Sequence, residues 1–445
     1  MLLEARPHGP LGGAIVVPGD KSISHRALLF AALAAGRSRI RGLLEAEDVQ
    51  ATARALTALG IEIAAGEGGV VEVCGAGTAG LAEPEDVLDC GNAGTLARLL
   101  LGMLAGHPFR VALTGDPSLR RRPMGRVCVP LRAMGARIEA REGDRLPLTI
   151  AGRLQPIPLA WRSQVASAQV KSALLLAGLH APGETSVVEP APSRDHSERM
   201  LRAMGAAVET HAEGGGAQRV TIRGHAELTP ISLEIPGDPS SAAFPLVAAL
   251  LAPGSELVIR EVGLNPHRTG LVVTLREMGA EIEIGGRRER GGEPVGDLHI
   301  RSSRLRAVEV PAARAPSMID EYPILAVAAA LAQGTTVMRG LAELRVKESD
   351  RLAAILAGLT ACGVEAHVEG EDLFVRGTAG RPPRGGAVID ARLDHRIAMS
   401  FLVLGGVAEK PVCVRGAEAI ATSFPGFVET MNGIGCDIRT AEEEA

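Results

Sequence analysis

Apolar and polar positions along the chain follow one short pattern that returns six times. Most copies read Leu-x-x-Met or Leu, then Gly, and then residues that alternate between apolar and polar. This predicts an amphipathic helix, a left-handed glycine cap and a strand. The glycines of the six copies are Gly60, Gly135, Gly205, Gly279, Gly363 and Gly435. Their spacing of about 70 to 84 residues predicts a repeated α/β protein.

A longer repeat groups the six units into two halves. The segment VPGDKSISHRALLF begins at Val17, and the related segment IPGDPSSAAFPLV begins at Ile235, about three units later. Repetition alone is equally typical of a scaffold and of an enzyme. The asymmetry favours a functional site, because the polar run KSISHR of the first copy is replaced by PSSAAF in the second.

Composition limits the class of protein. Of the 445 residues 46% are hydrophobic and only 2% aromatic, so the cores must be aliphatic. A net charge of −5 provides no general positive field for nucleic acid. We find no secretory-signal pattern and no apolar run long enough for a membrane span. The six cysteines form no CxxC pair, so we expect reduced thiols, a cytoplasmic protein and no structural metal.

Lysine is rare in this chain, which otherwise uses arginine as its cation. Its four lysines are Lys21, Lys171, Lys347 and Lys410. A retained lysine suggests a need for a compact or tunable ammonium. Lys21 and Lys347 lie in the two most polar motifs, whereas we interpret Lys171 as structural and Lys410 as part of a surface turn.

The first polar motif, PGDKSISHR, stands where a strand gives way to a helix. Lys21, Ser22 and Arg26 would lie at the helix N-terminus, where free N–H groups favour an anion. Arg26 follows Ser22 by four positions, so both can face one side. An ordinary helix cap is the alternative. A nucleotide P-loop is excluded, since the glycine spacing is wrong and Asp20 intervenes.

Further motifs of the first half are also polar at expected helix starts. Gly94 lies in a small-residue loop, GNAGT, that would let backbone approach a ligand. Arg122 precedes Pro123, which could fix the guanidinium for a bidentate contact with carboxylate or phosphate. By themselves these motifs are as typical of caps and solvated charges as of binding. The remaining residues of this group are Ser167, Ala168, Gln169 and Arg194.

The second half carries three polar motifs beside apolar helices. Asp320 directly precedes the run EYPILAVAAA, where a carboxylate would either cap the helix or take part in chemistry. Lys347 and Arg351 are four positions apart and should converge, so we expect a ligand to supply the negative charge between them. Glu348 lies in the same turn, and Arg396 stands before another buried helix.

Cations, carboxylates and amide or hydroxyl groups therefore stand at expected helix N-termini in both halves. Such termini favour negative charge through their dipole and their unpaired N–H groups. We predict a cleft between two domains that closes around a small molecule with several negative charges.

Seven motifs in order resemble the 5-enolpyruvylshikimate-3-phosphate synthase family, in its class II bacterial branch. They are PGDKSISHR, GNAGT, RPM, SAQ, DEYP, RVKESDR and LDHR, and they extend from about Val17 to Phe427. The resemblance implies an α/β fold, a two-domain inside-out barrel in which each domain has three βαβαββ repeats. It implies one domain of residues 21–235 and a second of residues 1–20 with 236–445, so that the first strand joins the C-terminal half.

The same resemblance implies an activity. The family transfers the enolpyruvyl group of phosphoenolpyruvate to the 5-hydroxyl of shikimate 3-phosphate, in aromatic amino-acid biosynthesis, without metal or organic cofactor. It implies a cytoplasmic monomer with no nucleic-acid or membrane partner.

The implied ligand residues form two overlapping sets. Shikimate 3-phosphate would meet Lys21, Ser22, Arg26, Ser167, Ala168, Gln169, Arg194, Asp320 and Lys347. Phosphoenolpyruvate would meet Lys21, Gly94, Arg122, Gln169, Arg351 and Arg396. As a hypothesis of mechanism, Glu348 donates the proton to C3 and Asp320 accepts the hydroxyl proton, helped by Lys21 or Lys347.

Three positions show where this chain differs from the family that it resembles, or how it would respond to an inhibitor. Ser423 stands where many relatives carry a lysine before Phe-Pro, so one anion contact is missing or replaced. Gly94 leaves room that an alanine would crowd, which predicts sensitivity to glyphosate. Leu99, where many relatives have proline, could offset that effect.

Two other functions remain as alternatives. The sister enolpyruvyl transferase acting on UDP-N-acetylglucosamine commonly has a reactive cysteine before its Arg-Pro, and the loop from Gly115 to Pro123 has none. A non-enzymatic repeat protein that binds nucleic acid or a partner should show a basic stripe or an exposed apolar patch. The net acidic charge and the motifs present in one copy disfavour it.

Overall fold

A computed structural model describes residues 1–442 as two compact units. The N-terminal unit comprises Gly19–Ile235 together with the short segment Glu289–Glu293. The C-terminal unit comprises Met1–Pro18, Pro236–Arg288 and the chain from Pro294 on. Each unit contains three four-stranded sheets, as a protein of six repeated units requires.

The sheets of the N-terminal unit share one strand order. Their strands are β14 (Ser232–Glu234), β3 (Ala35–Arg41), β5 (Val70–Ala76) and β4 (Glu62–Ala65); β6 (Leu88–Asp89), β7 (Arg110–Thr114), β9 (Arg145–Ala151) and β8 (Arg137–Arg141); β10 (Ala160–Arg162), β11 (Glu184–Glu189), β13 (Gln218–Arg223) and β12 (Val208–Ala212). The first strand of each runs parallel to its neighbour, and the others pair antiparallel.

The C-terminal unit repeats this order. Its strands are β22 (Val388–Asp390), β23 (Val412–Arg415), β1 (Leu2–Arg6) and β24 (Asp437–Thr440); β2 (Gly12–Val16), β15 (Glu256–Gly263), β17 (Glu293–Arg301) and β16 (Glu281–Arg290); β18 (Glu309–Val310), β19 (Thr335–Met338), β21 (Asp372–Arg376) and β20 (Glu365–Glu369). The start of the chain contributes to two of these sheets, since β1 pairs with β23 and β24 while β2 pairs with β15.

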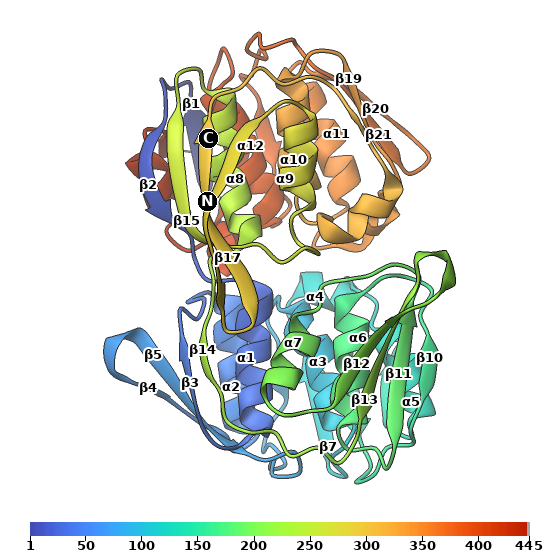
Figure 1. Cartoon of the computed structure of the whole chain (residues 1–445). Helices are drawn as coiled ribbons and strands as arrows, with labels where there is room; N and C mark the ends of the chain where they lie inside the picture. Colours follow the sequence, from blue (N-terminus) through green and yellow to red (C-terminus); the bar gives the residue numbers. More distant parts are fainter. Residues whose placement is uncertain (443–445) are drawn as a thin grey trace. The chain divides into compact units, whose positions relative to one another are not determined.

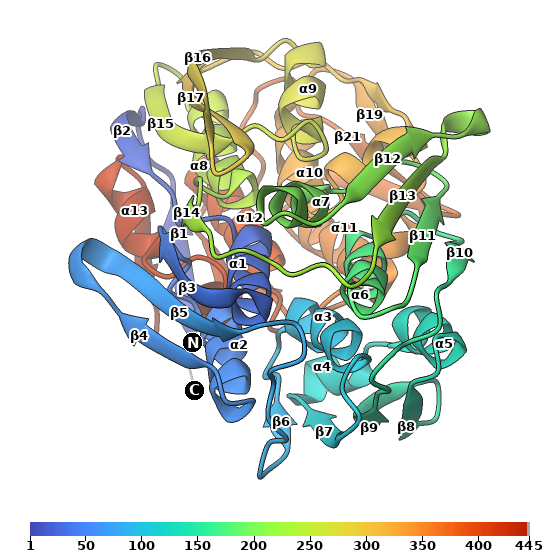
Figure 2. The same cartoon turned by 60° about the horizontal axis from the view of Figure 1, so that its bottom comes forward.

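Three helices in each unit are buried on nearly all sides. They are α1 (Lys21–Leu33), α3 (Gly94–Leu104) and α6 (Ala168–Gly178) in the N-terminal unit, and α8 (Pro239–Leu251), α10 (Tyr322–Leu331) and α12 (His395–Gly406) in the C-terminal unit. Helices that are apolar all round belong in a core. Figure 1 shows α8, α10 and α12 side by side, with β19, β20 and β21 on the outer side of α10 and α11 (Arg351–Ala361), and Figure 2 shows α3 and α6 together inside their unit. The predicted inside-out arrangement is confirmed.

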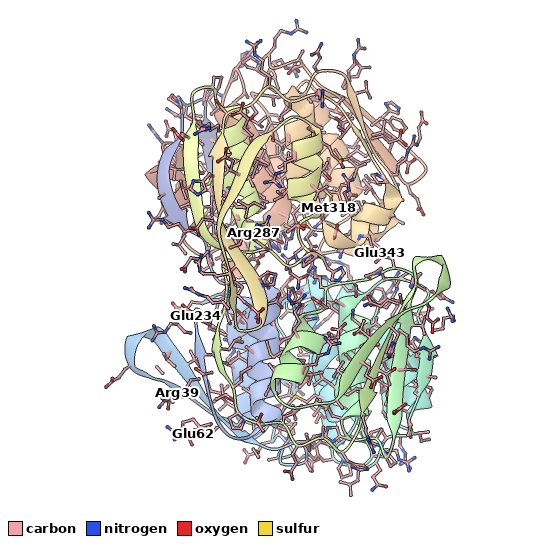
Figure 3. The ribbon with its side chains drawn as sticks, viewed as in Figure 1. Arg39, Glu62, Glu234, Arg287, Met318 and Glu343 are labelled. Carbon is pink, nitrogen blue, oxygen red and sulfur yellow. The ribbon has the colours of Figure 1, made fainter. Side chains whose placement is uncertain are left out.

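The remaining helices are amphipathic or short. They are α2 (Glu47–Ala58), α4 (Pro117–Arg121), α5 (Gly125–Ala133), α7 (His196–Ala203), α9 (Gly270–Glu277), α11 (Arg351–Ala361) and α13 (Phe427–Gly433), with 3-10 turns η1 (Glu67–Gly69), η2 (Gly214–Gly216), η3 (Ala312–Ser317), η4 (Ala342–Val346) and η5 (Ala417–Thr422). The sheets turn polar side chains outward: Arg39 on β3 and Glu62 on β4, labelled in Figure 3, are exposed.

The six predicted glycine caps all have the predicted backbone. Each of the six glycines follows a helix and precedes a strand, and their φ values lie between 82° for Gly363 and 114° for Gly435. An L-residue with a side chain is strained in this region, so the repeated glycine has a physical reason.

Candidate functional site

The predicted site residues form two sets, one in each unit, and almost all stand at helix starts. In the N-terminal unit α1 begins at Lys21, α3 at Gly94 and α6 at Ala168. In the C-terminal unit Asp320 lies just before α10, α11 begins at Arg351 and α12 at His395. The prediction that the polar motifs stand at helix N-termini is therefore confirmed.

The start of α1 is fixed by its own cap and by α2. Asp20 accepts a hydrogen bond from the Ile23 amide at 2.9 Å, which satisfies one unpaired donor of the first turn. Lys21 forms an ion pair with Asp48 in the first turn of α2. His25 is buried, and burial, with the charges of Lys21 and Arg26, lowers its pKa well below the usual range. His25 is therefore an uncharged side chain close to two cations.

Arg26 is buried and oriented by neutral oxygens. Its Nε donates to Ser197 Oγ at 2.8 Å, Nη2 to Ser172 Oγ at 3.0 Å and Nη1 to the Ser22 carbonyl at 2.9 Å. These three hydrogen bonds fix the orientation of the guanidinium. The sequence suggested Arg26 but gave no sign of Ser172 and Ser197, which come from α6 and α7.

Arg122 belongs to the cluster around the start of α3. Its Nη2 donates to Asn92 Oδ1 at 2.6 Å and to Ser118 Oγ at 3.2 Å. A Cβ built on Gly94 would lie 3.1 Å from Arg122 Nη1 and 2.8 Å from Arg98 Nη1. The glycine therefore allows two arginine side chains to come close together.

Arg98 is a residue of this cluster that the sequence reasoning missed. Its Nη1 donates to Gln169 Oε1 at 3.1 Å and to the Gly94 carbonyl at 3.2 Å, and Nη2 donates to the Pro123 carbonyl at 3.1 Å. Gln169 in turn donates to Thr95 Oγ1 at 3.0 Å. Arg98 lies one turn after Gly94, and that spacing on one helical face was the available signal.

The set in the C-terminal unit is built around a completely buried arginine. Arg351 contacts three carboxylates: Nε lies 2.8 Å from Asp394 Oδ2, Nη1 lies 3.0 Å from Asp320 Oδ1 and Nη2 lies 2.5 Å from Glu348 Oε2. Burial alone would lower the pKa of Arg351, but the charges of these three carboxylates raise it.

This geometry corrects one expectation from the sequence. We expected Lys347 and Arg351 to repel each other unless a ligand intervened, but Asp320 lies between them, 3.9 Å from Lys347 Nζ and 3.0 Å from Arg351. The protein itself supplies the anion, because the loop before α10 brings Asp320 to the start of α11.

Arg396 lies beside the same carboxylates. Its Nη1 donates to the Asp320 carbonyl at 3.4 Å and lies 3.7 Å from Glu321 Oε1. Glu321 is buried and accepts a hydrogen bond from Ser240 Oγ. Ser240 belongs to the second PGD segment and accepts from Arg268 at 2.6 Å. This second copy of the motif is thus connected to the site residues of its own unit.

The departures noted in the sequence lie in different surroundings. Leu99 is fully buried in α3, and Ser423 is buried at the end of η5. Ser167 caps α6 through a hydrogen bond from the Val170 amide at 3.5 Å, whereas Arg194 lies half-buried before α7.

One group of residues that could hold a metal ion occurs among residues 1–442. It consists of Asp195, His196 and Glu293, whose candidate ligand atoms all lie within 4.8 Å of one another. His196 Nδ1 is already 2.7 Å from Glu293 Oε1, and Arg199 Nε donates to Asp195 at 2.9 Å. The cluster is therefore tied together by hydrogen bonds and an arginine charge. Within the same residues, no helix is long and apolar enough to cross a membrane.

Comparison with known proteins gives one consistent family. The family model described as EPSP synthase (3-phosphoshikimate 1-carboxyvinyltransferase) matches residues 5–431. The chain is 60% identical to a protein of Acidiphilium cryptum named 3-phosphoshikimate 1-carboxyvinyltransferase, over 98% of this chain and 97% of that protein. A protein of the same name from Paramagnetospirillum magneticum is 57% identical over 98% of each chain.

Solved structures agree with this result. The EPSP synthase of Acinetobacter baumannii superposes with a TM-score of 0.86 and 42% identity, covering 99% of this chain and 100% of that one. The enolpyruvyl transferase NikO of Streptomyces tendae has a TM-score of 0.78 at 20% identity over 98% of each chain, and this match bears on the fold alone.

Proposed function

Since the chain belongs to the EPSP synthase (3-phosphoshikimate 1-carboxyvinyltransferase) family, we infer that it transfers the enolpyruvyl group of phosphoenolpyruvate to shikimate 3-phosphate. The acceptor is the 5-hydroxyl, and the products are 5-enolpyruvylshikimate 3-phosphate and phosphate. The reaction is a step of aromatic amino-acid biosynthesis by the shikimate pathway.

One observation carries the assignment of the site: residues far apart in sequence gather at helix N-termini within each unit, and both sets are rich in cations. Helix N-termini and arginine forks both favour phosphate and carboxylate. The two substrates are anions of these two kinds. In our proposal both sets act on the same pair of molecules, since the reaction joins the two substrates.

In our proposal shikimate 3-phosphate is bound mainly by the N-terminal unit. Its ligands there are Lys21, Ser22, Arg26, Ser167, Ala168, Gln169 and Arg194, and Asp320 and Lys347 contribute from the C-terminal unit. Phosphoenolpyruvate is bound by Lys21, Gly94, Arg122, Gln169, Arg351 and Arg396. Arg351 is fully buried and contacts three carboxylates. A substrate can therefore contact it only if one of these carboxylates gives up part of its own contact with the guanidinium.

The carboxylates of the C-terminal unit supply the proton transfers in this proposal. Glu348 donates a proton to C3 of phosphoenolpyruvate, which makes C2 electrophilic, and Asp320 accepts the proton of the attacking hydroxyl. A tetrahedral intermediate forms and then loses phosphate and a proton. Asp320 and Glu348 share Arg351, so a single cation orients both groups. Lys347, 3.9 Å from Asp320, or Lys21 assists the proton transfer at Asp320.

A coupled assay tests the function directly. Purified protein should release phosphate only when shikimate 3-phosphate and phosphoenolpyruvate are both present, and mass spectrometry should find the enolpyruvyl product. Release of phosphate with UDP-N-acetylglucosamine instead would favour the sister enzyme and contradict our assignment.

Two further properties belong to the same proposal. We expect a monomer that works in the cytoplasm without metal, cofactor or nucleic acid. Gel filtration tests the oligomeric state, and an assay after treatment with a chelator tests whether the activity needs a metal. We also expect glyphosate to compete with phosphoenolpyruvate, since Gly94 adds no methyl group beside Arg122. Weak inhibition of the wild-type protein would instead indicate that Leu99 offsets Gly94.

A further inference from the structure

Three ionisable side chains are buried together in the N-terminal unit, away from solvent. Lys171, Glu189 and Glu198 are each only 1% exposed. Lys171 Nζ lies 2.8 Å from Glu189 Oε2 and 2.8 Å from Glu198 Oε1. The lysine comes from the first turn of α6, Glu189 is the last residue of β11, and Glu198 lies in the first turn of α7. We call these three residues the buried triad.

Stability alone is a poor reason for such a triad. A buried ion pair costs desolvation, and well-packed apolar residues of similar volume often serve stability equally well or better. Burial would lower the pKa of Lys171, but the charges of Glu198 and Glu189 raise it, so the lysine stays charged. The role of the buried triad therefore has to lie in the residues that it holds in place.

Glu189 holds two loops that carry predicted ligand residues. Its Oε1 accepts a hydrogen bond from the Ser167 amide at 2.8 Å, and the Ser193 hydroxyl donates to both of its oxygens at 2.8 and 2.9 Å. Lys171 Nζ also donates to the Ser193 carbonyl at 3.4 Å. One loop leads into Ser167 and α6, and the other leads through Arg194 into α7.

The triad also joins the two helices that hold Arg26. Ser172 follows Lys171 on α6, and Ser197 precedes Glu198 on α7. Both hydroxyls accept hydrogen bonds from Arg26, and they lie 2.6 Å from each other. A shift of α7 against α6 would therefore move both acceptors of Arg26.

We propose that Glu189, held by Lys171 and Glu198, is a positioning residue that sets the two loops and Arg26 for binding shikimate 3-phosphate. The triad itself touches no substrate in this proposal, which rests on the proposed function. A site works when its supporting groups lock the contacting groups in place, and small displacements weaken binding strongly. The triad fixes the amide of Ser167, the hydroxyl of Ser193 and the guanidinium of Arg26 through one carboxylate and two helices.

The principal test is Glu189→Gln, which keeps the shape but removes the charge and one acceptor oxygen. We expect KM for shikimate 3-phosphate to rise about tenfold or more, while KM for phosphoenolpyruvate changes less than about threefold. Wild-type turnover in the same assay reports on the proposed function independently of the variant. Equal changes in both KM values, or none, would overturn the proposal even if the wild type is active.

Hydrogen exchange supplies a readout that needs no substrate. In the unliganded Glu189→Gln protein we expect faster amide exchange in residues 163–169 and 190–196, with the strands of the same unit unchanged. Unchanged exchange in both loops would contradict the proposal whatever the kinetics show.

A matched control separates positioning from loss of stability. Val187 is fully buried in β11 and faces the core two residues before Glu189, so Val187→Ala destabilises the same strand by leaving a cavity. This control should lower the melting temperature without changing either KM. If Glu189→Gln does not fold, Lys171→Gln carries the test, since it keeps a donor for Glu189 but removes the charge, and the same shift in KM for shikimate 3-phosphate is expected.

Discussion

The two units hold their arginines in different ways. In the N-terminal unit Arg26 donates to two serine hydroxyls and a backbone carbonyl, and Arg122 donates to Asn92 and Ser118. In the C-terminal unit Arg351 is enclosed by Asp320, Glu348 and Asp394. The named acceptors of Arg26 and Arg122 carry no charge, whereas the carboxylates around Arg351 compensate its charge and can also exchange protons. In our proposal the carboxylates around Arg351 also carry the proton transfers, so we expect substitutions there to affect mainly turnover and substitutions in the N-terminal unit to affect mainly binding.

The two PGD segments show how a repeat can diverge in this way. Asp20 and Asp238 cap their helices alike, through the amides of Ile23 and Ser240. Asp238 is also paired with Arg268 at 2.9 Å, whereas Lys21 follows Asp20 and pairs with the next helix. In the second copy the cation is therefore Arg268, which is buried and paired with the capping Asp238 itself.

The largest expected effect concerns Glu348, which donates the proton in our proposal. Glu348→Gln keeps a hydrogen-bond acceptor for Arg351 but removes the acid, so kcat should fall by about 10²–10⁴-fold with small changes in either KM. Steady-state kinetics with a thermal melt as folding control measure this. Near-normal turnover in a folded protein would remove Glu348 from the mechanism and weaken the division between the units.

The buried carboxylates should matter more for stability than the neutral partners do. Asp394 contacts Arg351 and accepts from the Arg396 amide at 3.0 Å, so Asp394→Ala should cost about 3–5 kcal/mol in the free energy of unfolding, because it leaves Arg351 poorly compensated. Urea denaturation checks the value. As a control, Asp390→Ala removes an exposed carboxylate that accepts from the Arg392 amide and should cost far less.

Binding should be the property that suffers in the N-terminal unit. Arg122→Lys keeps the charge but loses the planar fork, so KM for phosphoenolpyruvate should rise about 10- to 100-fold while kcat falls less. A fall in kcat with unchanged KM would assign chemistry to this unit and break the comparison. Arg121→Lys, at an exposed neighbour in the same run, is the matched control.

The smallest expected effect comes from a methyl group. In Gly94→Ala the new Cβ must displace the ends of Arg98 and Arg122, so KM for phosphoenolpyruvate should rise by several-fold and glyphosate inhibition should weaken more strongly. Competition assays at several phosphoenolpyruvate concentrations measure both changes. If the two constants change in proportion, the glycine does not discriminate between substrate and inhibitor.

Local sequence signals were sufficient for the repeated fold and for the helix starts. The six glycines combine helical spacing, a cap and alternation, and these local features survive packing. Lys21, Gly94 and Arg351 could be placed at helix N-termini because each precedes an apolar run.

The partners of the buried charges could not be predicted, because they come from distant positions. Asp394 is 43 positions from Arg351, and Glu293 is 97 positions from His196. Helical spacing predicts neighbours three or four positions apart and says nothing about such pairs. For this reason the expected repulsion between Lys347 and Arg351 was wrong, and Lys171 was interpreted as structural without any sign of Glu189 or Glu198.

The order in which the chain is made bears on how the C-terminal unit folds. Strand β1 is made long before its partner β23, in which Arg415 pairs with Leu2. At about 5–20 residues per second, some 20–80 s separate the synthesis of these two strands. Until then β1 lacks both of its neighbours in the sheet, β23 and β24, and has to stay unaggregated. An N-terminal fusion that tethers or blocks these first residues should therefore hinder maturation of the far end of the protein.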